Sequence, residues 1–142
     1  MSSKTKNFFE CKKNPAWAIE LKSENKIVGI VKMEFVFEMH ELCELGWKLN
    51  YKYWNNGYAT EAIEAIISYI FNETNVNRIE VCVWKGNKAS ERVVEKLGLT
   101  YEGFARQARI RHDYIEKGSK EYFDVSIFSV VRTDKIPTKT KL

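Results

Sequence analysis

The sequence predicts an α+β fold, in which a sheet is flanked by helices, in one domain of 142 residues. Segments rich in β-branched and aromatic residues recur along the chain between short polar turns, which is typical of strands. Two other segments repeat apolar residues at three- and four-residue steps, which indicates amphipathic helices. No repeat or linker divides the chain. We therefore expect a single domain over residues 1–142, with a core of about 17–132 and loose ends.

Three strands are predicted in the first third of the chain. Residues 17–21 (WAIEL) and 27–37 (IVGIVKMEFVF) flank the polar turn 22–26 and predict a β-hairpin. Residues 43–49 (CELGWKL) follow as a third strand. Side chains alternate along a strand, so one face of this third strand carries Cys43, Leu45, Trp47 and Leu49.

Two helices are predicted in the middle of the chain, on either side of the strand 78–84 (RIEVCVW). The apolar stripe of the first comprises Ala59, Ala62, Ile63, Ile66, Ile67, Ile70 and Phe71. The second begins at Asn87, a natural N-cap, and ends at Gly98. Its inward residues are Ala89, Val93, Val94 and Leu97.

The last third predicts two long antiparallel strands, residues 100–110 and 121–132, around the polar stretch 111–120 with Gly118 in the turn. The expected order of elements is thus β-β-β-α-β-α-β-β.

The composition excludes several classes of protein. A net charge of +4 is too small to indicate nucleic-acid binding, and 44% hydrophobic residues indicate a folded chain. Three cysteines without metal-ligand spacing predict neither a zinc site nor a disulfide framework. There is no signal-like or membrane-spanning stretch, so we expect a cytoplasmic protein without membrane partners.

Residues 54–62 (WNNGYATEA) place a glycine turn directly between a strand and a helix. The first N–H groups of a helix lack internal partners and carry partial positive charge, so such a junction suits a phosphate. Many turns of this kind need a glycine only to reverse direction, and the junction alone leaves that reading open.

Four segments together resemble the GNAT superfamily of N-acetyltransferases, and more narrowly its RimJ/RimL type, which acetylates the N-termini of ribosomal proteins. They are GWKL at 46–49, YWNNGYATEA at 53–62, NKAS at 87–90 and EKLG at 95–98. The coenzyme motif Gln/Arg-x-x-Gly-x-Gly/Ala falls on Trp54, Gly57 and Ala59, so its first position departs from the family pattern. Trp54 would then act through packing or its backbone.

The resemblance implies a mixed, mostly antiparallel sheet in which the strands 43–49 and 78–84 splay apart around acetyl-CoA, the co-substrate, with no metal. The pyrophosphate would lie against residues 55–60 and the pantetheine arm against 47–49. Asn87 and Ser90 would approach the pantetheine and the sulfur, although Asn87 is equally explained as a helix cap. The implied coenzyme site comprises Trp47, Lys48, Leu49, Trp54, Asn55, Asn56, Gly57, Tyr58, Ala59, Thr60, Asn87 and Ser90.

The resemblance also implies direct attack of a primary amine on the thioester, without an acyl-enzyme. Ser90 would assist the departing sulfur, unless it is a solvated helix residue. Some family members place a glutamate base nineteen residues after this serine, where the chain has Arg109. Glu44 is the substitute we select, with a solvated sheet residue as the alternative. His40 and His112 stand in polar stretches typical of surface imidazoles.

An α-amine with a pKa near 7.8 is neutral about 300 times more often at pH 7 than a lysine near 10.4, so a weak base favours an α-amine acceptor, either a protein N-terminus or a small amine. The family usually begins with a strand and two helices, whereas this chain looks as if it starts late. An exposed sheet edge would then favour a homodimer. Two rival readings are a shortened CoA-binding remnant with little turnover and a purely structural module.

Overall fold

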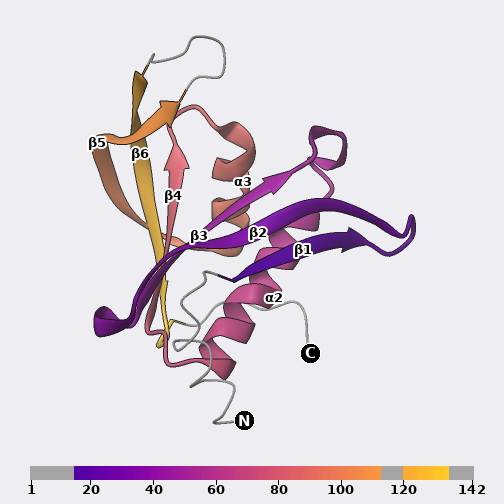
Figure 1. The fold of residues 1–142 in the computed structure, drawn as a ribbon, viewed down its shortest axis with the longest axis horizontal. Coiled ribbons are helices and arrows are strands. Elements are labelled where there is room, and N and C mark those ends of the chain that lie inside the picture. The colour runs from indigo at the N-terminus through magenta and orange to yellow at the C-terminus, as the bar shows by residue number, and fades with distance from the viewer. Residues whose placement is uncertain (1–14, 113–119, 135–142) are drawn as a thin grey trace.

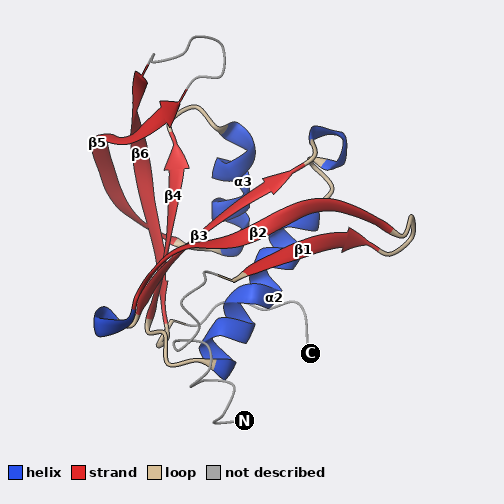
Figure 2. Cartoon of the chain, viewed as in Figure 1, coloured by secondary structure: helices blue, strands red, loops and turns tan. Residues whose placement is uncertain are grey.

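The computed structural model describes residues 15–112 and 120–134. Within them the strands form one sheet in the order β1-β2-β3-β4-β6-β5, and the two long helices pack against it (Figures 1 and 2). The elements are β1 (Ala16–Leu21), β2 (Lys26–Phe37), the 3-10 helix η1 (Glu38–His40), β3 (Leu42–Leu49), the 3-10 helix η2 (Tyr51–Tyr53), α2 (Tyr58–Glu73), β4 (Arg78–Trp84), α3 (Lys88–Leu97), β5 (Thr100–His112) and β6 (Lys120–Val131).

The first half of the sheet is an antiparallel meander covered by α2. β1 pairs with β2 and β2 with β3. The apolar stripe of α2 buries Ala59, Ile63, Ile66, Ile67 and Ile70 in one core cluster with strand residues such as Met33 and Leu45. Burial of this stripe, rather than helix propensity alone, holds α2 in place.

The second half consists of β4, β6 and β5, which pair antiparallel, with α3 beside them. Val94 and Leu97 of α3 join the same core. Gly98 then ends the helix in the left-handed conformation, with φ at 69°. This conformation costs little only for a residue without a Cβ.

The two halves meet where β3 runs parallel to β4, but this pairing extends only from Leu42 opposite Arg78 to Glu44 opposite Glu80. Beyond Glu44 the two strands separate, and Figure 1 shows β3 and β4 diverging from their common lower end. The expected splayed strand pair is therefore present.

The predicted order of elements and the mixed, mostly antiparallel sheet are confirmed. Two local details differ. Residues 51–53, to which the sequence assigned no helix or strand, form η2. β5 continues to His112 and β6 begins at Lys120, so both strands extend into the segment 111–120 that was predicted as a polar stretch between them. Gly118, Cys11 and the segment before residue 15 lie outside the described residues. No helix in the described part of the chain is long and apolar enough to cross a bilayer.

Candidate functional site

The connection between β3 and α2 is held by side chains that bond to its own backbone. Asn50 accepts a hydrogen bond from Lys52 N, and Asn56 Nδ2 donates to the carbonyls of Tyr53 and Trp54. The indole N–H of Trp54 donates to Leu49 O at 2.7 Å. The connection is therefore tied to the end of β3 before α2 begins.

α2 begins after Gly57, which has a φ of 79° and supplies no capping side chain. A Cβ at this position would meet no other atom within 4 Å, so the space beside the turn is open. The first N–H groups of α2 thus face a cavity rather than a protein cap. This is the geometry in which a helix N-terminus binds an anion.

α3 begins nearby with Asn87 as its N-cap, whose Oδ1 accepts from Ser90 N at 3.2 Å. One turn further along, Arg92 Nη1 donates to Asn55 Oδ1 at 2.6 Å. Asn55 itself has a φ of 63°. This hydrogen bond ties α3 to the turn that precedes α2.

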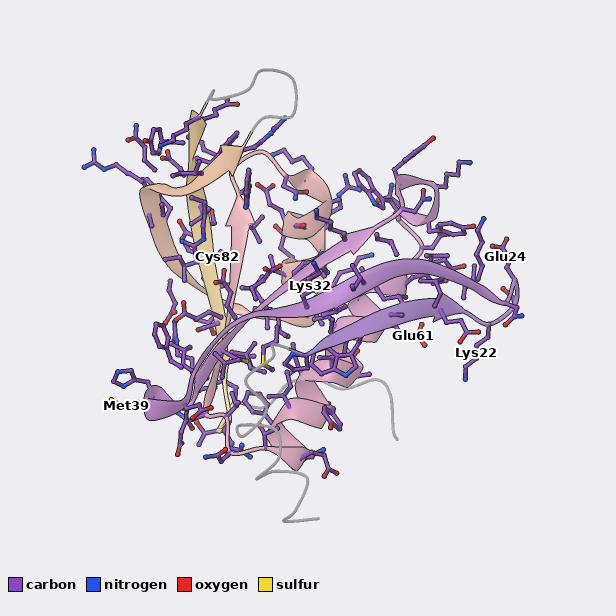
Figure 3. The ribbon with its side chains drawn as sticks, viewed as in Figure 1. Lys22, Glu24, Lys32, Met39, Glu61 and Cys82 are labelled. Carbon is purple, nitrogen blue, oxygen red and sulfur yellow. The ribbon has the colours of Figure 1, made fainter. Side chains whose placement is uncertain are left out.

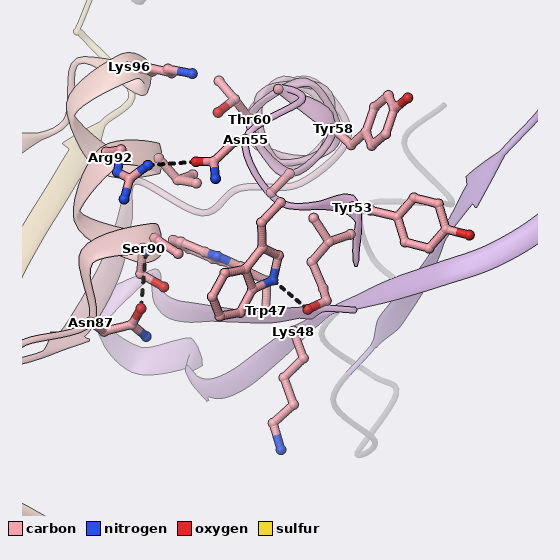
Figure 4. A pocket seen from close by; sticks show the side chains of 16 residues that line it. Trp47, Lys48, Tyr53, Asn55, Tyr58, Thr60, Asn87, Ser90, Arg92 and Lys96 are labelled. Carbon is pink, nitrogen blue, oxygen red and sulfur yellow. Dashed lines mark hydrogen bonds between the residues drawn. The ribbon is translucent and has the colours of Figure 1, made fainter. Parts of the chain in front are cut away.

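A cavity of about 330 Å³ lies between β3, α2 and α3. Figure 4 shows Lys96, Thr60, Asn55 and Arg92 toward one end of it and Asn87 and Ser90 toward the other. Every predicted coenzyme residue except Asn56 lines this cavity. The lining residues are Trp47, Lys48, Leu49, Tyr53, Trp54, Asn55, Gly57, Tyr58, Ala59, Thr60, Asn87, Ala89, Ser90, Arg92, Val93 and Lys96.

The edge of β3 beyond Glu44 presents main-chain groups to this space. Asn50 N donates a hydrogen bond to Val28 O. In an antiparallel pair every second residue of a strand bonds to the same neighbour, so this bond and the register show which residues of β3 bond to β2. Lys48 then bonds to β2, whereas the N–H and C=O groups of Trp47 and the N–H group of Leu49 point to the other side, where Leu49 O already accepts from the Trp54 indole. These are the groups that an extended amide chain between β3 and β4 would pair with.

A second cavity, of about 420 Å³, adjoins the first and shares with it Trp47, Lys48, Asn87 and Ser90. It contains Glu44, whose carboxylate forms an ion pair with Arg109 Nη2 at 3.3 Å. Arg109 Nη2 also lies 3.6 Å from Cys82 Sγ. Burial, and after it a hydrogen bond to Glu44, raises the pKa of the Cys82 thiol to about 12. The structure thus brings both predicted catalytic residues, Ser90 and Glu44, to the lining of one cavity.

Sequence reasoning assigned no role to four charged residues of these cavities, which are Glu34, Arg92, Lys96 and Arg109. Arg92 and Lys96 stand four residues apart on α3, beside its apolar stripe, and that spacing was the available signal. Glu34 lines the second cavity from β2. A Cβ on Gly46 would meet its Oε1 at 2.5 Å, so the glycine leaves room for this carboxylate.

His40 is not among the residues that line either cavity. His40 is exposed in η1, next to the Phe37 ring. Glu24 accepts a hydrogen bond from Tyr53, which lines the first cavity. Figure 3 shows Met39, the neighbour of His40 in η1, at the opposite end of the molecule from Glu24. His112 ends β5, and its side chain is not among those described.

Comparison with known proteins gives a consistent result. The sequence profile of a family described as an acetyltransferase (GNAT) domain matches residues 2–100. The uncharacterized N-acetyltransferase YoaA of Bacillus subtilis is 28% identical over 87% of this chain and 66% of its own length. The chain spans less than two thirds of the length of such curated relatives.

Solved structures share the fold. An acetyltransferase (GNAT family) from Bacillus anthracis is 32% identical, with a TM-score of 0.70, over 84% of this chain and 67% of that one. A ribosomal-protein-S5-alanine acetyltransferase from Vibrio fischeri has a TM-score of 0.75 at 21% identity, over 90% of this chain and 67% of that one. Relatives named as ribosomal N-acetyltransferases also match in sequence, which confirms the RimJ/RimL-like resemblance.

Proposed function

Because this chain belongs to the GNAT acetyltransferase family, we propose that it transfers the acetyl group of acetyl-CoA to a primary amine. The observation that carries the proposal is the meeting of two cavities where β3 and β4 separate. One cavity offers N–H groups and cations, and the other offers a carboxylate. A phosphate-bearing thioester and an amine can therefore approach each other at the shared wall.

The residues of the first cavity suit the parts of the coenzyme in order. The uncapped N-terminus of α2 after Gly57, together with Arg92 and Lys96, provides donors and positive charge for the phosphates. The outward N–H and C=O groups of Trp47 and the outward N–H group of Leu49 suit the amides of the pantetheine arm. Ser90 lies where the two cavities join, and the thioester would be held there.

The reaction then follows from what the second cavity holds. The amine nitrogen forms a bond to the acetyl carbon, and the carbon–sulfur bond breaks. The neutral amine gives its proton to Glu44, directly or through water, and Glu44 returns to its carboxylate form when an equivalent proton reaches the departing sulfur. The Ser90 hydroxyl donates a hydrogen bond to that sulfur. N–H groups of the β3 edge stabilise the oxyanion that develops on the acetyl oxygen.

Cys82 lies in the same cavity, yet its pKa of about 12 leaves it protonated at neutral pH. The thiolate, not the thiol, is the nucleophile in cysteine catalysis. This supports direct attack by the amine over an acyl-cysteine intermediate.

The test has two steps on one sample. Calorimetric titration with acetyl-CoA measures binding, and a free-thiol assay then measures release of CoA when an amine or a peptide beginning with Ala or Ser is added. We expect binding followed by amine-dependent thiol release. Binding without release for any amine would favour a CoA-binding protein without transferase activity, and absence of binding would refute both readings.

A variant separates the proposed chemical role from binding. Ser90→Ala is expected to lower kcat more than it weakens acetyl-CoA binding, because the hydroxyl acts on the leaving sulfur. Equal losses in both would mean that Ser90 serves binding alone.

A further inference from the structure

The ion pair between Glu44 and Arg109 lies inside the second cavity and joins residues 65 positions apart. The Arg109 Nη2 atom is 3.3 and 3.4 Å from the two carboxylate oxygens of Glu44. The Glu44 side chain is 15% exposed and that of Arg109 is 43% exposed. The carboxylate is therefore largely enclosed, while the Arg109 side chain is partly exposed where it lines the cavity.

A bulge in β5 aims Arg109 across the sheet. Ala105 pairs with Val125 and Arg109 with Phe123, so residues 106–108 lie opposite the single residue Asp124. Asp124 Oδ1 accepts a hydrogen bond from Gln107 N at 2.8 Å, and Gln107 has a φ of 50°. Bulges redirect side chains, and this one is fixed by a side-chain hydrogen bond. Arg109 Nη1 is further held by Ala108 O.

The charged side chains that line the second cavity balance one another: Glu34 and Glu44 against Lys48 and Arg109. A protonated amine without a carboxylate, bound at Glu44, would compete with Arg109 for the Glu44 carboxylate. That one carboxylate would then face two cations, the ammonium group and the Arg109 guanidinium. A ligand with both an ammonium and a carboxylate group would give each member of the pair a partner. Guanidinium groups bind carboxylates with two parallel hydrogen bonds.

We propose that the acceptor is a free α-amino acid, held with its amine at Glu44 and its carboxylate at Arg109. This inference rests on the proposed acetyl transfer and adds the class of acceptor. The amine of the bound amino acid lies at the wall shared with Ser90, where the thioester arrives. Its ammonium group gives up one proton to Glu44 before attack. The second proton leaves the nitrogen as the C–N bond forms and the C–S bond breaks, and the departing thiolate takes up a proton in its place. The product is an N-acetylamino acid whose nitrogen no longer carries positive charge. The product therefore gives up its ion pair with Glu44, which favours release.

The test compares each acceptor with its own amide. The twenty standard L-amino acids and their α-carboxamides are assayed with acetyl-CoA by release of free CoA thiol. The amide lacks the carboxylate, and its amine deprotonates more readily, so amine basicity alone would favour the amide. We expect at least one amino acid to exceed its amide in kcat/KM by about tenfold or more, the effect of one charge-assisted pair.

Arg109→Gln is expected to abolish that preference, because kcat/KM should fall further for the amino acid than for its amide. Arg109→Lys keeps the charge without the planar pair of donors, so its preference for the amino acid over the amide should lie between those of the unmodified protein and Arg109→Gln. Arg106→Gln is the matched control, since Arg106 is exposed in the same bulge and lines neither cavity. Circular dichroism spectra establish that the variants fold.

The outcomes separate this inference from the proposed function. If amides or peptides are acetylated and no amino acid exceeds its amide, the acceptor class is wrong and the transferase stands. If no acceptor reacts, calorimetric titration of the CoA-loaded protein with the same amino acids decides. Binding that Arg109→Gln abolishes would keep the zwitterion site and refute the transferase, whereas no binding would refute both.

Discussion

Arg92 and Asn55 form a contact at the end of the first cavity where we propose that the phosphates of acetyl-CoA bind. The Arg92 guanidinium is exposed and fixed by the Asn55 side chain at 2.6 Å, with Lys96 one turn further along α3. A cation held in place beside a helix N-terminus loses little freedom when a phosphate arrives. The hydrogen bond to Asn55 would therefore reduce the entropy that the Arg92 side chain loses in the proposed phosphate contact.

Replacing Arg92 with Gln should weaken acetyl-CoA binding by about tenfold or more, because one charge-assisted hydrogen bond to phosphate is lost. Calorimetric titration at two salt concentrations is the measurement, and the variant should also show a weaker dependence on salt. Lys88→Gln is the control, since Lys88 is exposed, pairs with Glu91 at 3.5 Å and lies outside the cavity lining. Equal effects of the two substitutions would contradict a specific phosphate contact.

At the scale of elements, one side chain secures the end of the long helix. Arg132, just beyond β6, donates to the carbonyls of Phe71, Thr74 and Val76. Its guanidinium also lies 5.5 Å from the centre of the Phe71 ring. The last carbonyls of a helix lack internal partners, and a cation there also interacts favourably with the helix dipole. Arg132 thus joins α2 to the sheet.

Arg132→Ala should lower the free energy of unfolding by about 1.5–3 kcal/mol, the range for hydrogen bonds to charged groups. Urea denaturation followed by circular dichroism measures it. Arg106→Ala, on an exposed strand position, should change stability by less than about 0.5 kcal/mol. Acetyl-CoA affinity should be unchanged in Arg132→Ala, because the residue lies outside both cavity linings. A stability equal to that of the control would mean that water replaces these bonds without loss.

The elements that sequence patterns predicted are those that local periodicity determines. The stripe of α2, the Asn87 cap and the Gly98 stop all depend on residues within one or two turns. The Glu44–Arg109 pair, the Arg132 contacts and the β5 bulge depend on strand order and register, which no local pattern encodes. Asn56 was assigned to the coenzyme from its place in a motif, whereas its side chain bonds to the turn itself.

At the scale of the whole molecule, the core gives stability a dependence on alkaline pH. Burial, and then the nearby Glu44 and Glu80 carboxylates, raises the pKa of Cys43 from 9.0 to about 12. The folded state therefore holds the thiol proton more tightly than the unfolded state. This contribution is complete below pH 9 and is lost as the pH rises from 9 toward 12.

Cys43→Ala should make the free energy of unfolding fall less steeply with pH above pH 9. The difference in slope should be up to about 1.4 kcal/mol per pH unit, the limit for one proton. The free energy of unfolding at pH 8, 9 and 10, from urea titrations of both proteins, measures the slopes. The variant should start less stable, because Cys43 is fully buried and its sulfur fills core space. Parallel slopes would show that the thiol does not titrate between the folded and unfolded states as described.

Among the described residues, the short β3–β4 pairing is what joins the two halves of the sheet, and the first cavity lies where that pairing has ended. A coenzyme bound there would act as a bridge between β3 and α2 on one side and α3 on the other.

Amide hydrogen exchange with and without acetyl-CoA tests this bridge. Exchange should slow most at Trp47 and Leu49, whose N–H groups face the cavity, and at the first turn of α2. The Lys48 amide already bonds to β2. Its free energy of exchange should rise only by the global stabilisation that all core amides share, which is about 2.7 kcal/mol when the acetyl-CoA concentration is 100 times its Kd. Equal protection of the Trp47, Lys48 and Leu49 amides would contradict pairing of the coenzyme with the edge of β3. The coenzyme would then act on exchange through global stabilisation alone.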